Sequence, residues 1–225
     1  MQRMKLLGKG NTAEVFEYET AKVCKLFFEG YPHEYIHLEF ENAKEMYRNK
    51  INIPKPFQIV TIGRREGIVY EKIEGKTLLN IIMTEHEEPP DKYLDMFVAV
   101  HLNILAHCSG NVLSYKEYLI AMLKGKKVNN QMMFHKIMGL PDGDCLLHGD
   151  FHPGNILVMP DKTPVVIDFM NVCCGPALYD IARTYFLIKQ CEGDLARQYL
   201  KRINTQENDI EEYLNIIELC RKYES

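Results

Sequence analysis

The first third of the chain alternates between hydrophobic and polar positions in a way that predicts an antiparallel sheet. Over residues 3–28 the pattern predicts three strands: MKLLGKG runs into a glycine turn, AEVFEY alternates, and KVCKLFF is apolar apart from its lysines. Farther along, PFQIVTIG and GIVYEKI flank a turn at residues 64–67, which predicts a second hairpin.

One helix is predicted between these two groups of strands, over residues 33–50. Its apolar residues recur at helical spacing, and Pro54 and Pro56 end it. The apolar positions of this helix are Ile36, Phe40, Ala43 and Tyr47.

From Gly75 to about residue 140 the pattern becomes helical. One helix is expected to begin near Asp91 and to end before Gly110, and another to begin at Ser114, whose spacing from Glu117 matches a capping box. The first of these helices carries one apolar stripe, formed by Leu94, Phe97, Val98, His101, Ile104 and Leu105.

Strand character returns in CLLHGD and TPVVIDF, which are separated by a loop that holds Asn155. After Gly175 the pattern is helical to the end. The sequence therefore predicts an α+β fold of two lobes. An N-terminal antiparallel sheet with one helix occupies residues 1–73, and a mostly helical lobe occupies residues 74–225.

Composition excludes several classes of protein. The 225 residues are 46% hydrophobic and 26% charged, which is ordinary for a globular chain. The net charge of −4 offers no basic excess for nucleic acid, and no apolar run approaches the ~18 residues of a membrane span. Seven cysteines at irregular spacing, without a CxxC pair or a secretion signal, favour reduced thiols in a cytoplasmic protein and disfavour a zinc site.

The block LLHGDFHPGNILV, followed by VVIDF, carries the strongest chemical signal. Asp150 and Asn155 lie five residues apart on one loop, and Asp168 follows 18 residues after Asp150 at the end of an apolar strand. Each of these residues alone is commonly found in a turn. As an ordered set, they offer one carboxylate to orient a hydroxyl, and an amide oxygen and a second carboxylate to hold Mg²⁺.

These motifs resemble the aminoglycoside phosphotransferase and choline kinase family, which are small-molecule relatives of the protein kinases. The resemblance rests on HGDFHPGNIL, IDF and GPALYDIART, and it spans roughly residues 5–188. It implies a two-lobed protein-kinase-like fold and an enzyme that moves the γ-phosphate of ATP, with Mg²⁺, to a hydroxyl of a small molecule. It also implies Asp150 as the catalytic carboxylate, Asn155 and Asp168 as Mg²⁺ ligands, and Asp180 as a buried aspartate that braces the catalytic loop.

The same resemblance assigns the nucleotide-binding residues of the N-terminal lobe. Gly8, Gly10 and Asn11 belong to a glycine-rich turn in which Ala13 replaces the third glycine of the kinase pattern. Lys25 resembles the strand lysine that holds the α- and β-phosphates. Lys22 is the alternative, but it lies three positions away and would point to the other face of the strand.

A helix carboxylate should orient this lysine, and Glu39 and Glu41 compete for the role. Glu39 is preferred because apolar residues follow it at +4 and +7. The segment IVYEKIEG resembles the connector whose backbone binds adenine, with the contacts expected from Glu71, Lys72 and Ile73.

The acceptor is expected to bind the helical lobe, within residues 85–140 and 176–225. A polycationic aminoglycoside would need a cluster of carboxylates, for which the candidates are Glu192, Asp194, Glu207, Asp209, Glu211 and Glu212. A quaternary ammonium acceptor such as choline would need an aromatic cage, for which the candidates are Tyr179, Tyr185, Phe186, Tyr199 and Tyr213. The absence of Trp weighs against choline, and a sugar-like acceptor also stays open. The pattern predicts no oligomeric state.

Two other functions stay open. The altered glycine turn and a short helical insert also suit a nucleotide-binding module without turnover. A protein kinase is disfavoured, because His148-Gly149-Asp150 lacks the usual arginine and Asp168-Phe169-Met170 lacks the usual glycine. The stretch from Asp168 to Gly175 is also short for an activation loop.

Overall fold

The computed structural model describes residues 4–84, 90–128 and 130–223. Contacts divide the chain into two compact units. The first contains residues 1–81 and 154–170, and the second contains residues 82–153 and 171–225. The lobe boundary at residue 73 stays a prediction, but the hairpin within 154–170 groups with the N-terminal residues. Parts of the expected acceptor region, at 85–89, 129 and 224–225, lie outside the described residues.

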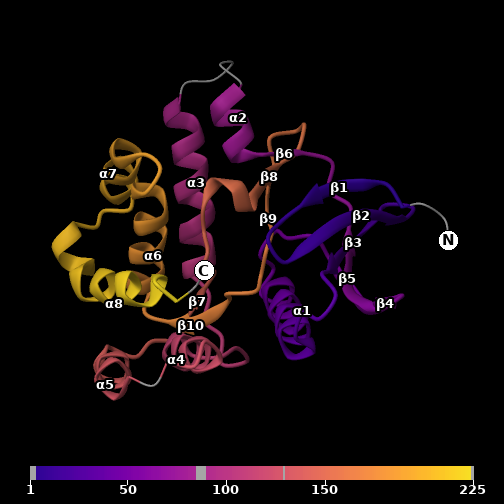
Figure 1. Ribbon diagram of the computed structural model, residues 1–225. Helices are drawn as coiled ribbons and strands as arrows, with labels where there is room; N and C mark the ends of the chain where they lie inside the picture. The colour runs from indigo at the N-terminus through magenta and orange to yellow at the C-terminus, as the bar shows by residue number, and fades with distance from the viewer. Residues whose placement is uncertain (1–3, 85–89, 129, 224–225) are drawn as a thin grey trace. The chain divides into compact units, whose positions relative to one another are not determined.

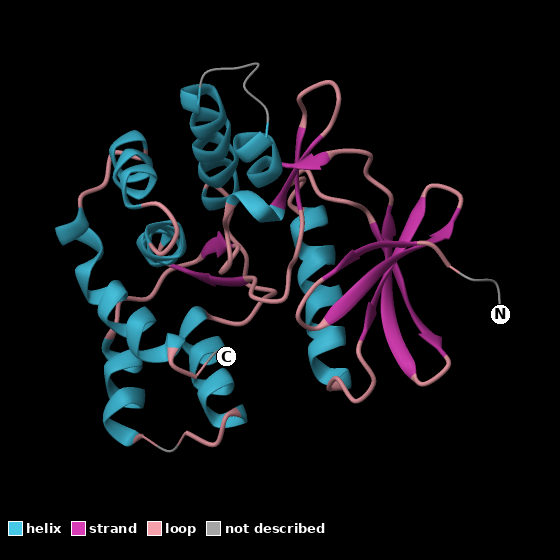
Figure 2. Cartoon of the chain, turned by 45° about the horizontal axis from the view of Figure 1, so that its top comes forward, coloured by secondary structure: helices cyan, strands magenta, loops and turns pink. Residues whose placement is uncertain are grey.

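The first unit is built on a five-stranded antiparallel sheet in the order β1-β2-β3-β5-β4, which twists strongly in Figure 2. A long helix, α1, packs on β4 and β5 and lies beside the sheet in both views (Figures 1 and 2). The elements are β1 (Leu6–Lys9), β2 (Ala13–Glu19), β3 (Lys22–Phe27), α1 (His33–Arg48), β4 (Pro56–Ile62) and β5 (Arg65–Glu71).

A second, small sheet completes this unit, in the order β6-β8-β9. The side-chain amide of Asn52 donates to the carbonyl of Pro164 at 2.7 Å, and the backbone carbonyl of Asn52 accepts from Val166 N–H at 2.9 Å. These bonds tie the β8–β9 hairpin to the segment after α1. The strands are β6 (Lys76–Thr77), β8 (Ile156–Val158) and β9 (Pro164–Val166), and the short helix α2 (Leu78–Thr84) follows β6.

The second unit is mainly helical and contains one two-stranded antiparallel sheet, β7 with β10. Ser114 and Glu117 form the predicted capping box at the start of α4. The predicted stripe of α3 is buried throughout, and His101 within it is fully buried. The elements are α3 (Pro90–Leu105), α4 (Tyr115–Gly125), α5 (Gln131–Gly139), β7 (Cys145–Leu147), β10 (Cys173–Gly175), α6 (Ala177–Lys189), α7 (Gly193–Arg202) and α8 (Glu211–Arg221). Two 3₁₀ turns occur at Pro153–Asn155 and Glu207–Ile210.

The α+β class and the N-terminal antiparallel sheet agree with the prediction, but several local predictions were wrong. The second hairpin turns at Gly63, whose φ is +66°, rather than over residues 64–67. Gly67 instead lies within β5. A Cβ at this position would lie 2.6 Å from Cys24 Sγ, which explains why the residue is glycine. The three-residue strands β7 and β9 lie in the predicted runs CLLHGD and TPVVIDF, but β6, β8 and β10, which have two or three residues each, were not predicted.

The buried face of α1 also differs from the predicted one. Tyr47 is 46% exposed, whereas Glu39 and Asn42 are buried beside Ile36, Ala43 and Met46. The hydrophobic pattern misplaced this face because three of its inward residues, Glu39, Asn42 and Glu45, are polar. All three side chains make hydrogen bonds within the unit that compensate for their burial.

Candidate active site

The β8–β9 hairpin brings the two expected metal ligands to one end of a pair of strands. Asn155 immediately precedes β8, and Asp168 lies two residues beyond β9. Ile156 pairs with Val166, and the N–H of Ile167 donates to the carbonyl of Asn155 at 3.0 Å. Antiparallel pairing therefore places Asn155 beside the residue that precedes Asp168. This arrangement holds within the first compact unit.

Lys25 joins three segments of that unit. It lies in β3, opposite Val15 of β2 and Ile68 of β5. Its ammonium donates to both carboxylate oxygens of Glu39, at 2.7 and 2.9 Å, and to Oδ1 of Asp168 at 3.0 Å.

The alternatives that the sequence left open are engaged elsewhere. Glu41 accepts from Lys44 on the exposed side of α1, and Lys22 donates to Glu19 across the β2–β3 turn. Of the two glutamates, Glu39 is therefore the one that contacts Lys25.

The electrostatics follow from one ammonium shared by two carboxylates. Burial alone would lower the pKa of Lys25, but Glu39 and Asp168 outweigh it and raise that pKa above its usual range. Burial raises the pKa of Glu39, and the charge of Asp168 adds to this effect while Lys25 opposes it. Lys25 therefore stays an ammonium, held in place by both acids.

The donor chemistry at the end of this hairpin suits magnesium. Asn155 contributes an amide oxygen and is 8% exposed, whereas the Asp168 carboxylate is 44% exposed. Mg²⁺ prefers a few such hard oxygen ligands, with phosphate and water completing its shell. In the described ranges no three His, Cys, Asp or Glu side chains gather into a metal-holding group. The residues thus fit a metal held jointly with phosphate rather than by a closed protein cage.

The glycine-rich segment, which runs from Gly8 in β1 through the turn before β2, is open. A Cβ added to Gly8 would meet nothing within 4 Å, and one on Gly10 would touch only the carbonyl of Ala13, at 3.7 Å. Gly10 N–H donates to that same carbonyl at 2.9 Å, and Asn11 is exposed at the tip. Packing in the described structure therefore does not explain why these two positions are glycine.

The connector after β5 is partly occupied by bonds of the fold itself. The backbone N–H of Glu71 donates to the carbonyl of Lys55, and the backbone N–H of Lys72 donates to the carbonyl of Ala21. The ammonium of Lys72 donates to the carboxylate of Glu17 at 2.9 Å. Ile73, the third connector residue named from the sequence, is half-buried.

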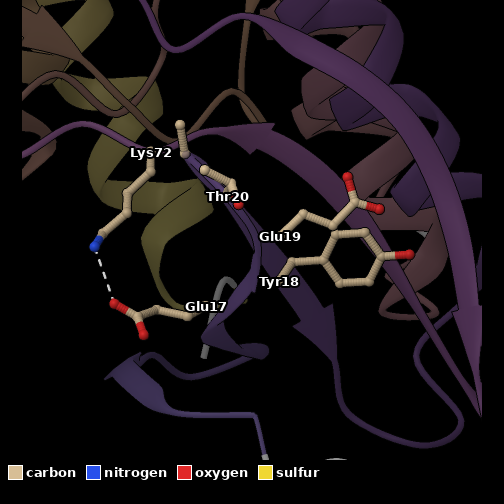
Figure 3. Close-up of a pocket in the computed structure, with 6 residues that line it drawn as sticks. Glu17, Tyr18, Glu19, Thr20 and Lys72 are labelled. Atoms are coloured by element: carbon tan, nitrogen blue, oxygen red, sulfur yellow. Dashed lines mark hydrogen bonds and ion pairs between the residues drawn. The ribbon is translucent and has the colours of Figure 1, made fainter.

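A recess of about 330 Å³ lies beside this connector. Figure 3 shows Lys72 and Glu17 turned toward each other on one side of it, with Tyr18 and Glu19 on the other. Its lining consists of the last three residues of β2, the two residues of the β2–β3 turn and Lys72, so neither Lys25 nor Asp168 borders it. We therefore do not assign this recess to a nucleotide.

Asp150 belongs to the second unit, on the loop after β7, with its side chain 31% exposed. Its carboxylate lies 3.8 Å from Nε2 of His152. The backbone of this loop is held by Asp180 of α6, which accepts from His148 N–H at 2.8 Å and from Gly149 N–H at 2.9 Å. Arg183, one turn further along α6, donates to the Gly149 carbonyl at 3.2 Å.

Asp180 is part of a longer buried chain of hydrogen bonds. Nε2 of His101 lies 3.1 Å from Asp180, and Nδ1 lies 2.7 Å from the hydroxyl of Tyr199. The ring of His101 stacks on Phe151 of the same loop, with centroids 4.4 Å apart. Burial would raise the pKa of Asp180, but the bonds from His101 and His148 outweigh it and lower that pKa.

The sequence reasoning missed the roles of three polar residues. His101 was assigned to an apolar stripe, Tyr199 to a cage, and Asn42 to no role. A usable signal for Asn42 was its position three residues after Glu39, which puts both on one face of a helix. His101 could have been singled out as the one ionisable residue in its stripe.

The sites divide cleanly between the two units. The expected nucleotide and metal residues, from Gly8 to Ile73 together with Asn155 and Asp168, all belong to the first unit. Asp150 belongs to the second, with the residues that brace its loop.

The comparisons with known proteins agree with these motifs. The profile of the phosphotransferase enzyme family matches residues 139–213, which include Asp150, Asn155 and Asp168. No curated protein sequence matches the chain. Across the described ranges, no helix is both long enough and apolar enough to cross a membrane.

Solved structures show the fold over nearly the whole chain. A thermostable mutant of aminoglycoside phosphotransferase APH(4)-Ia is 16% identical, with 100% of this chain and 87% of that chain covered and a TM-score of 0.68. The GDP and kanamycin complex of APH(2")-IIia is 14% identical, with 99% and 84% covered and a TM-score of 0.67. Aminoglycoside-3'-phosphotransferase of type VIII is 14% identical, with 98% and 93% covered and a TM-score of 0.65.

These findings confirm the resemblance predicted from the sequence. The chain is similar to the phosphotransferase enzyme family over residues 139–213, and its fold is that of the aminoglycoside phosphotransferases.

Proposed function

We propose that the chain transfers the γ-phosphoryl group of ATP to a hydroxyl of a small molecule, with Mg²⁺ as the metal. The observation that carries the proposal is the pair of contacts made by Lys25. Its ammonium reaches Glu39, 14 residues away, and Asp168, 143 residues away. A fold that only needed a stable sheet would have little reason to gather three charges there, because burying charge is costly.

Each residue of this group then has a role. Lys25, held by Glu39, neutralises charge on the α- and β-phosphates. Asn155 and Asp168 would hold Mg²⁺ against the phosphates, and the metal would supply neutralisation of the charge that develops on them. The open turn at Gly8, Gly10 and Asn11 lets backbone N–H groups approach the phosphates without obstruction by a Cβ.

The base is proposed to bind the connector after β5. The N–H groups of Glu71 and Lys72 both bond within the fold, so the N–H of Ile73 is the proposed donor to adenine and the carbonyls of Glu71, Lys72 and Ile73 are the proposed acceptors. Adenine offers a donor and an acceptor on one edge, which suits a backbone carbonyl and a backbone N–H.

Asp150 is proposed as the carboxylate that orients the acceptor and receives its proton. The acceptor oxygen forms a bond to the γ-phosphorus as the bond to the β–γ bridging oxygen breaks. ADP leaves, and the proton of the hydroxyl passes to Asp150. The brace on the loop holds the backbone of Asp150 through its two preceding residues.

Residues of the helical unit limit which chemical class of acceptor the chain is proposed to use. Tyr179, Tyr185, Tyr199 and Tyr213 are each 2% exposed or less, so they are core residues and cannot form an open aromatic cage. Two of the proposed carboxylates are already paired, Glu207 with Lys189 and Asp194 with Arg197. The solved neighbours include complexes with kanamycin and with hygromycin B. The buried tyrosines disfavour choline, and the complexes of the solved neighbours favour an acceptor rich in hydroxyls, such as an aminoglycoside or a sugar-like molecule. The two ion pairs leave fewer carboxylates to hold a polycationic acceptor.

The experiment is a transfer assay with γ-labelled ATP and Mg²⁺ over aminoglycosides, sugars, amino alcohols and nucleosides. A parallel series uses GTP, because related folds have been solved with GDP and with ADP. We expect label to appear on a member of the hydroxyl-rich group. ATP binding without transfer to any member would favour a nucleotide-binding module, and transfer to a generic protein would favour a protein kinase.

A further inference from the structure

Asn42 is a buried polar residue of α1 that the chemistry described so far does not use. Its side chain is 2% exposed, and its amide nitrogen donates to the backbone carbonyl of Phe169 at 2.9 Å. The residues joined by this bond are 127 positions apart in sequence and belong to the same compact unit. A buried amide in a helix face is costly unless it is bonded, so this contact compensates for its burial.

The carbonyl that Asn42 holds belongs to the residue directly after Asp168. Asp168 has a φ of +70°, in the left-handed region that a non-glycine residue adopts at a cost of about 1–3 kcal/mol. Such a conformation persists only where neighbouring contacts enforce it. Here Asp168 is held at its carboxylate by Lys25, and the backbone one residue further along is held by the bond from Asn42 to the carbonyl of Phe169.

The ring of Phe169 reinforces the same placement. It is 2% exposed, and its centroid lies 6.3 Å from that of Tyr70. The hydroxyl of Tyr70 in turn lies 3.4 Å from Glu39. The carboxylate of Asp168, through Lys25, and the residue that follows it are thus tied to one small group of buried side chains.

Glu39 and Asn42 lie three residues apart and so share one face of α1. Glu39 places the ammonium that contacts phosphate in the proposed function, and Asn42 places the backbone that carries the proposed metal ligand. One helix face therefore positions both groups.

We propose that Asn42 is a positioning residue for Asp168, which fixes the direction of its carboxylate toward the metal through the carbonyl of Phe169. The inference rests on the proposed function, because it assigns Asn42 a role in metal-dependent nucleotide binding. Residues that orient metal ligands typically change metal affinity by about 10- to 100-fold when replaced.

A matched control exists on the same hairpin. Asn52 makes the same kind of bond, from its side-chain amide to the carbonyl of Pro164 at 2.7 Å, but at the opposite end of β9 from Asp168. Replacing Asn52 with Ala removes an amide-to-carbonyl bond from this hairpin without touching the residues around Asp168.

The test measures ADP binding by calorimetry, with and without Mn²⁺, for the full chain and three variants. We expect Mn²⁺ to tighten ADP binding to the wild type. In Asn42→Leu, which keeps the size of the side chain, and in Asn42→Ser, which is too short to reach Phe169, that metal-dependent gain should fall roughly 10-fold or more. Metal-free ADP affinity should stay within about twofold in both, and Asn52→Ala should keep the full gain.

The outcomes separate the two proposals. An undiminished metal-dependent gain in the Asn42 variants, or an equal loss in Asn52→Ala, would overturn the positioning role while nucleotide binding stands. ADP binding to the wild type that does not respond to Mn²⁺ would overturn the same role. A wild type that binds no ADP at all would overturn the proposed function itself.

Discussion

The hydroxyl of Tyr199 lies 2.7 Å from Nδ1 of His101, so a residue of α7 is bonded to the ring that contacts Asp180. A carboxylate can only accept, so Nε2 of His101 carries the proton toward Asp180. Nδ1 lies within hydrogen-bond distance of the Tyr199 hydroxyl, whose pKa is raised by burial. Asp180 therefore fixes the proton on Nε2, and Tyr199 holds the other side of the His101 ring in place behind the loop that carries Asp150.

Removing this hydroxyl should loosen the loop without altering nucleotide binding. In Tyr199→Phe we expect turnover to fall by roughly 3- to 10-fold, at a stability cost of about 1 kcal/mol for the lost buried bond. The KM for ATP should stay unchanged, because the residues proposed to bind the nucleotide belong to the other unit. Steady-state kinetics and urea unfolding measure the two effects. The comparison variant is Tyr213→Phe, another buried tyrosine of the same unit, and equal losses in both would contradict the role of Tyr199.

Asp180 predicts a pH dependence of stability. Its folded pKa is lowered below the ordinary value of 3.8, so the contribution is fully present above about pH 4. It is lost as the pH falls through the lower folded value, because the folded state then binds the proton too. Asp180→Asn should therefore be less stable than the wild type by a constant amount between pH 5 and pH 8, on the order of 2 kcal/mol. Urea unfolding of both proteins should show this gap narrowing below about pH 4, and a gap that widens there would contradict the assignment.

Replacement by Ala should lower stability at Gly149 but leave it nearly unchanged at Gly8 and Gly10. Gly149 has a φ of +76°, and a Cβ there would collide with the backbone of Asn171. Gly149→Ala should lower the free energy of unfolding by about 2–4 kcal/mol.

Gly8→Ala and Gly10→Ala should change stability by no more than about 0.5 kcal/mol, because the space around them is open. If phosphate occupies that space, both should still weaken ATP binding. Thermal unfolding and calorimetry on the three variants test this contrast. Unchanged ATP affinity in both Gly8→Ala and Gly10→Ala would contradict the proposal that this segment binds phosphate.

Lys25 and Lys22 form a matched pair on one strand. Lys25→Met removes the ammonium that Glu39 and Asp168 hold and should weaken ATP binding roughly 10- to 100-fold, the worth of a charge-assisted bond to phosphate. Lys22→Met removes an exposed contact with Glu19 and should change ATP affinity less than about twofold. Equal effects in the two variants, measured by calorimetry, would mean that Lys25 does not contact the nucleotide.

The fold was predictable where the periods were long and the motifs specific. The strands β2, β3 and β5, the helix α1 and the stripe of α3 follow from alternation and helical spacing. The capping box at Ser114 could be located because its residue types act locally.

Other features depend on contacts between distant segments and could not be derived in this way. The inward face of α1 carries Glu39 and Asn42, whose partners lie 14 and 127 residues away, so a scale of hydrophobicity assigns them to solvent. The three-residue strands β8 and β10 are defined by their pairing, β8 with β6 and β9, and β10 with β7. The brace from His101 to Asp180 spans 79 residues, and only the folded unit shows that a residue of the apolar stripe makes it.

The central claim is that this chain binds ATP through residues of one unit and transfers its phosphoryl group with a carboxylate of the other. Asp150→Asn tests it most directly, in a transfer assay with γ-labelled ATP on the best acceptor of the panel, together with calorimetric ATP binding. The account predicts ATP affinity within about twofold of the wild type and turnover at least roughly 100-fold lower, since a positioned carboxylate contributes that much to proton transfer. Normal turnover by Asp150→Asn on that acceptor would contradict it.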